Sequence, residues 1–139
     1  MKAKRFGSRF IVRIDKGEEI IETLIQFCKD NGIKLGTVQG IGATNKAVIG
    51  LFDAETKKYH SNELRGNHEI APLLGNISTM DGEVYLHIHV NLCDQEHNSF
   101  GGHLNSAVVS ATFEAVIDVI DGEIDRKFSD EIGLNLYKL

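Results

Sequence analysis

The segment from which the rest of the chain can be interpreted is residues 85–92, which read Tyr85-Leu86-His87-Ile88-His89-Val90-Asn91-Leu92. Its length and apolar residues predict a buried strand that carries two histidines two positions apart. Side chains alternate between the faces of a strand, so His87 and His89 point the same way, with Cα atoms about 7 Å apart. A third histidine, His103, follows a Gly101-Gly102 pair that can bend the chain back. The sequence therefore offers three imidazoles for a single ion.

Three neutral imidazoles without an evident fourth protein ligand are typical of an open Zn²⁺ site, in which water or a ligand takes the last position. The alternative is that they are ordinary core or interface histidines whose ring nitrogens are satisfied by hydrogen bonds. Context favours the metal, because each ring carries a donor and an acceptor that are costly to bury without partners. We expect His60, His68 and His97, which stand in polar surroundings, to be exposed bystanders.

Composition indicates one domain in a reducing compartment. A chain of 139 residues can bury a full core, so we expect a single domain over residues 1–139. No signal-peptide pattern and no apolar run of membrane-spanning length is present, and Cys28 and Cys93 form no paired motif. These features predict a cytoplasmic protein with two reduced thiols and no membrane contact.

The charge is unevenly distributed along the chain. Residues 1–13 carry five basic side chains and no acidic one, so the remaining residues hold 10 of the 15 basic residues against all 20 acidic ones, a balance of −10. A body this acidic repels a phosphate backbone and lacks the basic stripe of a duplex-binding surface. These charges argue against direct binding to duplex DNA, and residues 1–9 are expected to be a flexible basic arm that aids solubility.

Hydrophobic periodicity predicts one helix and several strands. Alternation over residues 8–14 indicates a first strand, and residues 16–19 then open a helix with a wide apolar stripe that includes Cys28. Asn31-Gly32 is a typical C-terminal cap. Cys28 lies on the stripe and is interpreted as a core residue rather than a nucleophile.

The chain after this helix has the pattern of strands. Gly40-Ile41-Gly42 lacks the context of a phosphate-binding loop and is expected to let a sheet bend or another backbone approach, while Pro72 implies an edge or a bulge. Asp81-Gly82 and Asp121-Gly122 are hairpin signals. Leucines alternate over residues 134–139 in a predicted final strand.

Glu114 stands in the middle of the apolar segment 107–120, which suits a long central strand. A lone acid buried in such a strand needs a partner. Two roles are open. Glu114 could orient a metal-bound histidine or act as a base beside the metal, or it could form a salt bridge to Arg126 or a contact across a subunit boundary.

Several of these segments occur in a recognisable order, which is Gly40-Ile41-Gly42-Ala43, Leu51-Phe52, Gly75-Asn76-Ile77-Ser78, His87-Ile88-His89, Gly101-Gly102-His103-Leu104, and a Glu114-centred strand followed by Gly122 and Arg126. This series resembles the PPC family, the plants and prokaryotes conserved domain, over almost the whole chain. The resemblance implies an α+β fold with a mixed, strongly curved, half-barrel-like sheet and one main helix, assembled as a homotrimer. It also implies that His87, His89 and His103 bind one zinc ion per protomer.

The resemblance leaves the activity open. We expect a small anionic ligand at the open metal position, and the residues do not decide whether a reaction follows. DNA binding is the alternative, since plant members carry this domain beside AT-hooks, although this chain has no Arg-Gly-Arg-Pro core and Pro72 is its only proline. A more distant likeness to acetolactate decarboxylase, which binds zinc through a similar histidine set, suggests a metal-dependent lyase or hydrolase acting on a small acid. A purely structural metal in a trimer is a further possibility.

Overall fold

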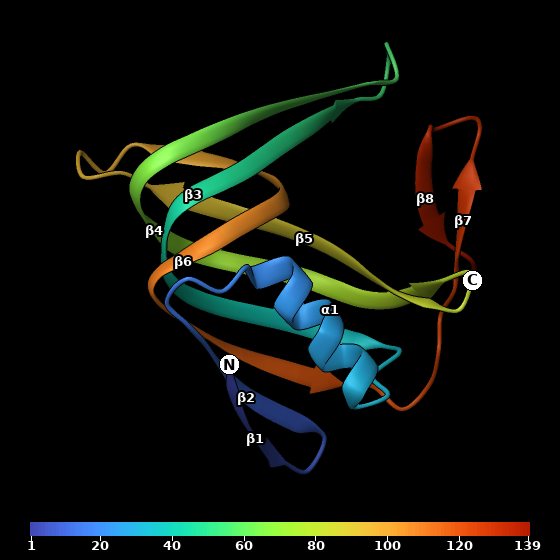
Figure 1. Cartoon of the computed structure of the whole chain (residues 1–139). Coiled ribbons are helices and arrows are strands. Elements are labelled where there is room, and N and C mark those ends of the chain that lie inside the picture. The colour runs from blue at the N-terminus through green and yellow to red at the C-terminus, as the bar shows by residue number, and fades with distance from the viewer.

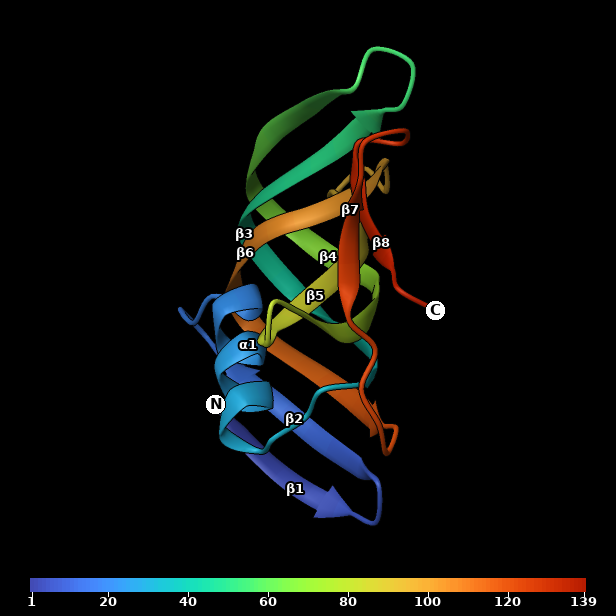
Figure 2. The same cartoon turned by 90° about the vertical axis from the view of Figure 1, so that its right-hand side faces the viewer.

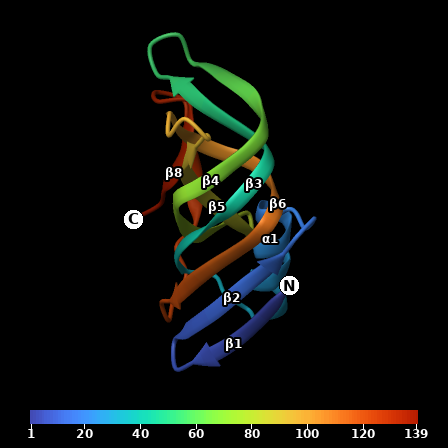
Figure 3. The same cartoon turned by 90° about the vertical axis from the view of Figure 1, so that its left-hand side faces the viewer.

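The computed structural model describes residues 1–139 and contains one helix and a strongly curved sheet, as expected of the α+β class (Figure 1). The elements in chain order are β1 (Lys2–Phe6), β2 (Arg9–Asp15), α1 (Ile20–Asp30), β3 (Gly36–Asp53), β4 (Lys58–Met80), β5 (Glu83–Cys93), β6 (Ser99–Val119), β7 (Arg126–Ser129) and β8 (Leu134–Tyr137). The long strands β3, β4 and β6 curve over their whole length, which is clearest from the side (Figure 3).

The first residues belong to the sheet rather than to a flexible arm. Backbone pairing joins residues 2–6 to residues 9–13 in an antiparallel hairpin. The ammonium group of Met1 donates a hydrogen bond to the carboxylate of Glu18 at 2.8 Å. The prediction of a flexible arm over residues 1–9 is therefore wrong. The edge of β2 supplies hydrogen-bond partners for the backbone groups of β1.

The helix begins and ends where the sequence predicts. The Glu19 side chain accepts a hydrogen bond from the backbone N–H of Glu22 at 2.6 Å, and Asn31 ends the helix, followed by Gly32 with a φ of 63°. Burial raises the pKa of the Cys28 thiol to about 12, which keeps it protonated as expected of a core residue. The buried residues of α1 are Ile20, Leu24, Phe27 and Cys28.

No helix has the length and apolar character needed to cross a membrane.

The main sheet has the strand order β1-β2-β6-β3-β4-β5, and every pairing in it is antiparallel. The expected mixture of parallel and antiparallel pairs is not found, because β6 lies between β2 and β3, the two strands that α1 connects. A further pairing of β5 with β6 makes a ring of β3, β4, β5 and β6 that does not close as a barrel. The core extends from α1 into this ring and includes Val38, Ile70, Ile88, Leu92 and Phe113.

Bulges let the long strands bend. The pairing of β3 with β4 shifts between Gly40 and Gly42, and a Cβ at Gly40 would lie 2.5 Å from the ring of Phe113. The pairing of β4 with β5 shifts between Ile70 and Leu73, the interval that contains Pro72. Both irregularities occur where the sequence predicts a bend or a bulge.

A separate two-stranded hairpin follows β6. The expected hairpin turn at residues 121–122 does not form, because the chain leaves the sheet there and β7 pairs with β8 instead. The backbone N–H of Thr79 donates to the carbonyl oxygen of Ile124 at 3.1 Å, and the Lys57 side chain donates to that of Asp130 at 2.5 Å. These bonds hold the β7–β8 hairpin beside the main sheet, in front of it in Figure 2.

Candidate metal centre

Strand pairing brings the three predicted histidines together. His87 and His89 lie on β5, and His103 on β6 is the direct antiparallel partner of His89. The ring centroids of His87 and His89 are 5.1 Å apart, and that of His103 lies 5.4 Å from the first and 5.8 Å from the second. One ring nitrogen from each residue lies within 4.8 Å of the others.

The donor set fits zinc. In a tetrahedral site, bonds of about 2.0–2.1 Å place two nitrogens about 3.4 Å apart, so small rotations of the three rings would bring them to that spacing. The cluster contains no fourth donor from histidine, cysteine or carboxylate. One coordination position would therefore be left for water or a ligand.

Burial keeps two of the three imidazoles neutral. His87 and His103 are half-buried, whereas His89 is exposed. Burial lowers the pKa of His87, and the positive charges of His89 and Arg126 lower it further. Burial also lowers the pKa of His103, with contributions from His87 and His89. Neutral imidazole is the form that coordinates a metal, so these donors are available at neutral pH.

The histidines line a cavity of about 610 Å³, a volume typical of sites for small molecules. One side of the cavity is built by the main sheet and the other by the β7–β8 hairpin. Its lining includes no aspartate or glutamate, and Arg126 is its only arginine or lysine. The other lining residues are Gly50, Leu51, Phe52, Ala54, Tyr59, Asn76, Tyr85, Gly102, Leu134, Asn135, Leu136 and Tyr137.

Arg126 lies beside the histidines in this cavity, whereas the sequence suggested for it only a salt bridge to Glu114. Its guanidinium donates to the hydroxyl of Ser78 and to the backbone carbonyl of Asn135, both at 2.8 Å. It also lies over the rings of Tyr85 and Tyr137, 4.8 and 4.2 Å from their centroids. Its position at the start of a short strand, after a loop of charged residues, gave no signal that it would be buried beside the histidines.

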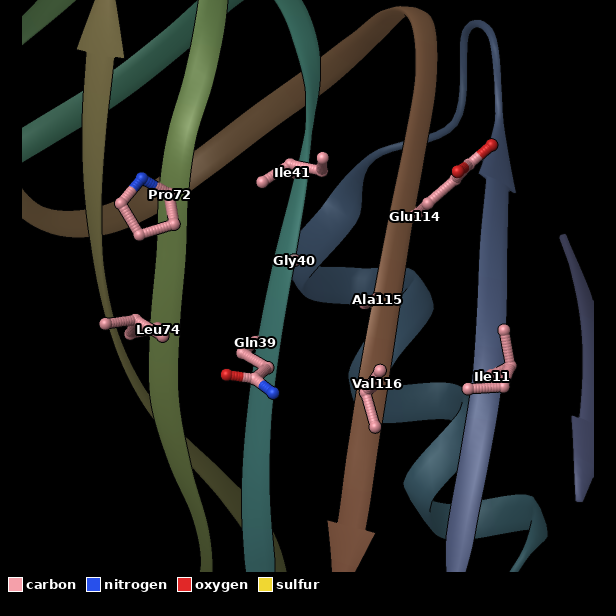
Figure 4. Close-up of a pocket in the computed structure, with 9 residues that line it drawn as sticks. All are labelled: Ile11, Gln39, Gly40, Ile41, Pro72, Leu74, Glu114, Ala115 and Val116. Carbon is pink, nitrogen blue, oxygen red and sulfur yellow. The ribbon is translucent and has the colours of Figure 1, made fainter. Parts of the chain in front are cut away.

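Glu114 is neither buried nor close to the histidines. Phe113 and Ala115 point into the core, so the alternation of β6 places Glu114 on the exposed surface between them. It lines a different pocket, of about 360 Å³, whose neighbours are shown in Figure 4. Strands β3 and β4 lie between this part of β6 and β5, a path of roughly 14 Å along the curved sheet. The expected contact with a metal ligand and the salt bridge to Arg126 are both absent.

The other three histidines do not join the cluster. His60 and His97 are exposed, as expected. His68 is buried instead, because its Nδ1 donates to the backbone carbonyl of Gly66 at 2.8 Å and its ring packs edge-on against Phe100. A local hydrogen bond thus satisfies this histidine without a metal.

Comparison with the profiles of known protein families shows the family to which this chain belongs. The profile of the Plants and Prokaryotes Conserved (PCC) domain matches residues 1–121, and the chain belongs to that family. The match includes all three histidines and ends before Arg126 and the β7–β8 hairpin. No curated protein shows significant similarity to the chain.

Solved structures agree with this assignment. A proposed DNA-binding protein from Bacteroides thetaiotaomicron superimposes with a TM-score of 0.96 at 36% identity, over 99% of this chain and 96% of the other. A metal-containing protein from Archaeoglobus fulgidus has a TM-score of 0.88 at 35% identity, over 100% of both chains. A plant- and prokaryote-conserved protein from Pyrococcus horikoshii has a TM-score of 0.87 at 33% identity, over 99% and 94%.

The expected distant likeness to acetolactate decarboxylase is also found. The enzyme from Bacillus subtilis has a TM-score of 0.51 at 17% identity, and the match covers 84% of this chain and 54% of the enzyme. At this identity the likeness concerns the fold alone.

Proposed function

We propose that this protein binds one zinc ion per protomer through His87, His89 and His103, assembles as a homotrimer, and holds a small anionic ligand at the open metal position. The observation that carries the proposal is the convergence of three imidazoles within 4.8 Å, two of them with lowered pKa values. The metal-containing relative from Archaeoglobus fulgidus supports it. When bound, zinc would supply a Lewis-acidic position for an oxygen of the ligand.

The charge of the cavity favours an anion. The chain as a whole has a net charge of −5, but the cavity is lined by histidines and Arg126 and by no carboxylate. Anions would therefore be repelled by most of the surface and attracted at this site. Leu51, Leu134 and Leu136 add an apolar wall that excludes water and strengthens such an attraction.

An exposed apolar face supports the homotrimer. Ile11 on β2, Ile41 on β3 and Leu74 on β4 line one pocket of the sheet surface and are 48%, 62% and 51% exposed in the single chain. Contiguous apolar surface of this kind is characteristic of subunit interfaces. Leu74 is also the pairing partner of His89 across β4 and β5, so a subunit docked on this face would border the metal site. Glu114 lies on the same face, where a contact across subunits is the role still open to it.

DNA binding is the second candidate, favoured by the name of the Bacteroides thetaiotaomicron relative. The basic residues at the N-terminus lie on the β1–β2 hairpin, and two of them are paired with acids: Arg9 with Asp118 at 3.2 Å, and Arg13 with Asp15 at 2.9 Å. We expect only weak, non-specific binding to duplex DNA at physiological salt. Sub-micromolar, sequence-dependent shifts of a DNA probe that persist after Lys2 and Lys4 are replaced by glutamine would favour the DNA-binding function.

A metal-dependent lyase or hydrolase acting on a small acid has less support. No carboxylate lines the cavity to serve as a general base, and Glu114 is on a different part of the surface. We therefore propose binding rather than a reaction.

Metal analysis tests the proposal. Protein purified without chelators should contain about one zinc per chain by mass spectrometry of the metal, and His89→Ala should lose most of it. His60→Ala is the matched control, because His60 is an exposed histidine on β4 outside the cluster and its loss should leave the zinc content unchanged. Full zinc occupancy in His89→Ala, or wild-type protein that takes up no zinc when offered it, would refute the assignment.

A further inference from the structure

Arg126 is a buried cation without an anionic partner. Only 7% of the residue is exposed, yet no carboxylate lies within ion-pair distance of it. The groups that hold it are neutral: a hydroxyl, a backbone carbonyl and two tyrosine rings. Burying a charge without a counter-ion is costly, so an arginine kept in this state indicates an anion that comes from outside the chain.

The guanidinium retains donors for such an anion. It has five N–H groups, and the protein uses two of them, one at Nε for Ser78 and one at Nη1 for Asn135. The remaining three belong to Nη1 and Nη2. Because Arg126 lines the same cavity as the histidines, these donors and the open metal position can serve one ligand.

The surroundings define the chemistry of that ligand. Arg126 is the only lysine or arginine in the lining, so it matches a single negative charge. Two terminal N–H groups of a guanidinium pair in its plane with the two oxygens of a carboxylate, whereas a phosphate brings more charge and more acceptors than three N–H groups satisfy. Leu51, Phe52, Leu134 and Leu136 suit an aliphatic body between the two polar ends.

We infer that Arg126 is the anchor for the carboxylate of a small aliphatic acid, a second binding point separate from the histidines. The inference rests on the proposed function for the other end of the ligand, where a second oxygen reaches the open metal position. The β7–β8 hairpin then selects the ligand, because it supplies Arg126 and Tyr137 and positions the guanidinium through Asn135.

Bifunctional ligands test the anchor, with their affinities for the zinc-loaded protein measured by isothermal titration calorimetry. Succinic and glutaric monohydroxamic acids carry a zinc-binding hydroxamate and a free carboxylate at two different spacings. Their matched neutral probes are the primary amides of the same chain length, and 3-phosphonopropionohydroxamic acid replaces the carboxylate with a phosphonate. At least one of the acids should bind about tenfold or more tightly than its amide and more tightly than the phosphonate.

Two substitutions assign the preference to Arg126. Arg126→Gln should abolish the acid-over-amide preference, and the affinity for the amide should fall much less than the affinity for the acid because the hydroxamate end depends on zinc. Lys127→Gln removes the adjacent charge on β7, which does not line the cavity, and should leave the preference intact. Should Arg126→Gln fail to fold by circular dichroism, Arg126→Lys keeps the charge but not the planar pair of donors, and should lose most of the preference.

The outcomes separate the anchor from the metal site. Amides that bind as tightly as both acids in the wild-type protein, or equal loss of preference in Lys127→Gln, would overturn the anchor. If the protein does not bind zinc, the proposed function is refuted instead. The anchor can then be tested on the zinc-free chain by adding butyrate or butyramide and following the NMR signal of the Arg126 Nε–H. Shifts caused by butyrate alone support it, and shifts caused by neither or by both overturn it.

Discussion

Replacing Ile41 with serine tests whether the apolar face formed by β2, β6, β3 and β4 is a subunit interface. Ile41 is the most exposed of the large apolar residues on this face, at 62%, and it lies between Glu114 of β6 and Pro72 of β4 (Figure 4). Most of its surface is already in contact with solvent in the single chain, so the substitution removes little packing within the protomer. The change should therefore affect assembly far more than the folding of the protomer.

The expected loss of trimer stability follows from the exposed fraction of Ile41. Full burial of an isoleucine side chain is worth about 1.5–3 kcal/mol, so covering the exposed part of Ile41 is worth about 1–2 kcal/mol per protomer. A symmetric trimer contains three copies, which gives about 3–6 kcal/mol, or a dissociation constant raised by about two to four orders of magnitude. The concentration at which half of the trimer dissociates varies as the square root of that constant, so it should rise about tenfold to a hundredfold.

Sedimentation velocity over a dilution series measures this shift directly. Ile120→Ser is the control, because Ile120 is similarly exposed, at 51%, but lies outside the apolar pocket around Glu114. A wild-type protein that sediments as a monomer at every concentration would refute the trimer. A trimer that dissociates at the same concentration with and without Ile41→Ser would place the interface on another face.

Two further predictions concern the zinc-free protomer and the curvature of the sheet. The folded state lowers the pKa values of His87 and His103, so the unfolded chain binds more protons than the folded one as the pH falls through about 6.5. The zinc-free protein should therefore lose stability between pH 7.5 and 5.5. Urea unfolding at both pH values measures this loss, which should be smaller in a variant that carries both His87→Gln and His103→Gln. Gly40→Ala should destabilise the protein by about 1–3 kcal/mol, because its Cβ would meet Phe113 at 2.5 Å and the Glu114 carbonyl at 2.8 Å. Gly101→Ala, whose Cβ would meet nothing closer than 3.5 Å, should change the free energy of unfolding little, and equal effects of the two substitutions would contradict the packing argument.

Local patterns in the sequence predict most of the elements and the convergence of the three histidines. The helix ends follow from Glu19 and Asn31-Gly32, whose capping depends only on neighbouring residues. The common direction of His87 and His89 follows from the alternation of one strand. The approach of His103 is less local, because the turn at residues 94–98 brings β6 back along β5. The expectation that Gly101 and Gly102 bend the chain is wrong, since they pair with Asn91 and Val90 inside the ladder.

The errors arise where the outcome depends on which strands become neighbours. Glu114 stands among apolar residues in the sequence, yet the phase of β6 gives the core to Phe113 and Ala115 and leaves the carboxylate outside. Residues 1–9 have a charge pattern typical of a solvated arm. Residues 2–6 nevertheless pair with β2, because β2 has a free edge, and the charge pattern carries no information about such pairing. Likewise, no spacing rule connects Arg126 to His87, because the loop that follows β6 brings them together.

The two halves of the candidate site therefore have different origins in the chain. The histidines depend on β5 and β6, which the family profile covers and whose antiparallel register fixes their geometry. Arg126 and the apolar wall depend on the β7–β8 hairpin, which lies beyond residue 121 and is joined to the sheet mainly by side-chain and loop hydrogen bonds. A chain can change such a hairpin without disturbing the three histidines. Relatives that share the three histidines should thus bind the same metal and yet differ in their ligands, and the residue at position 126 is where we expect that difference to be decided.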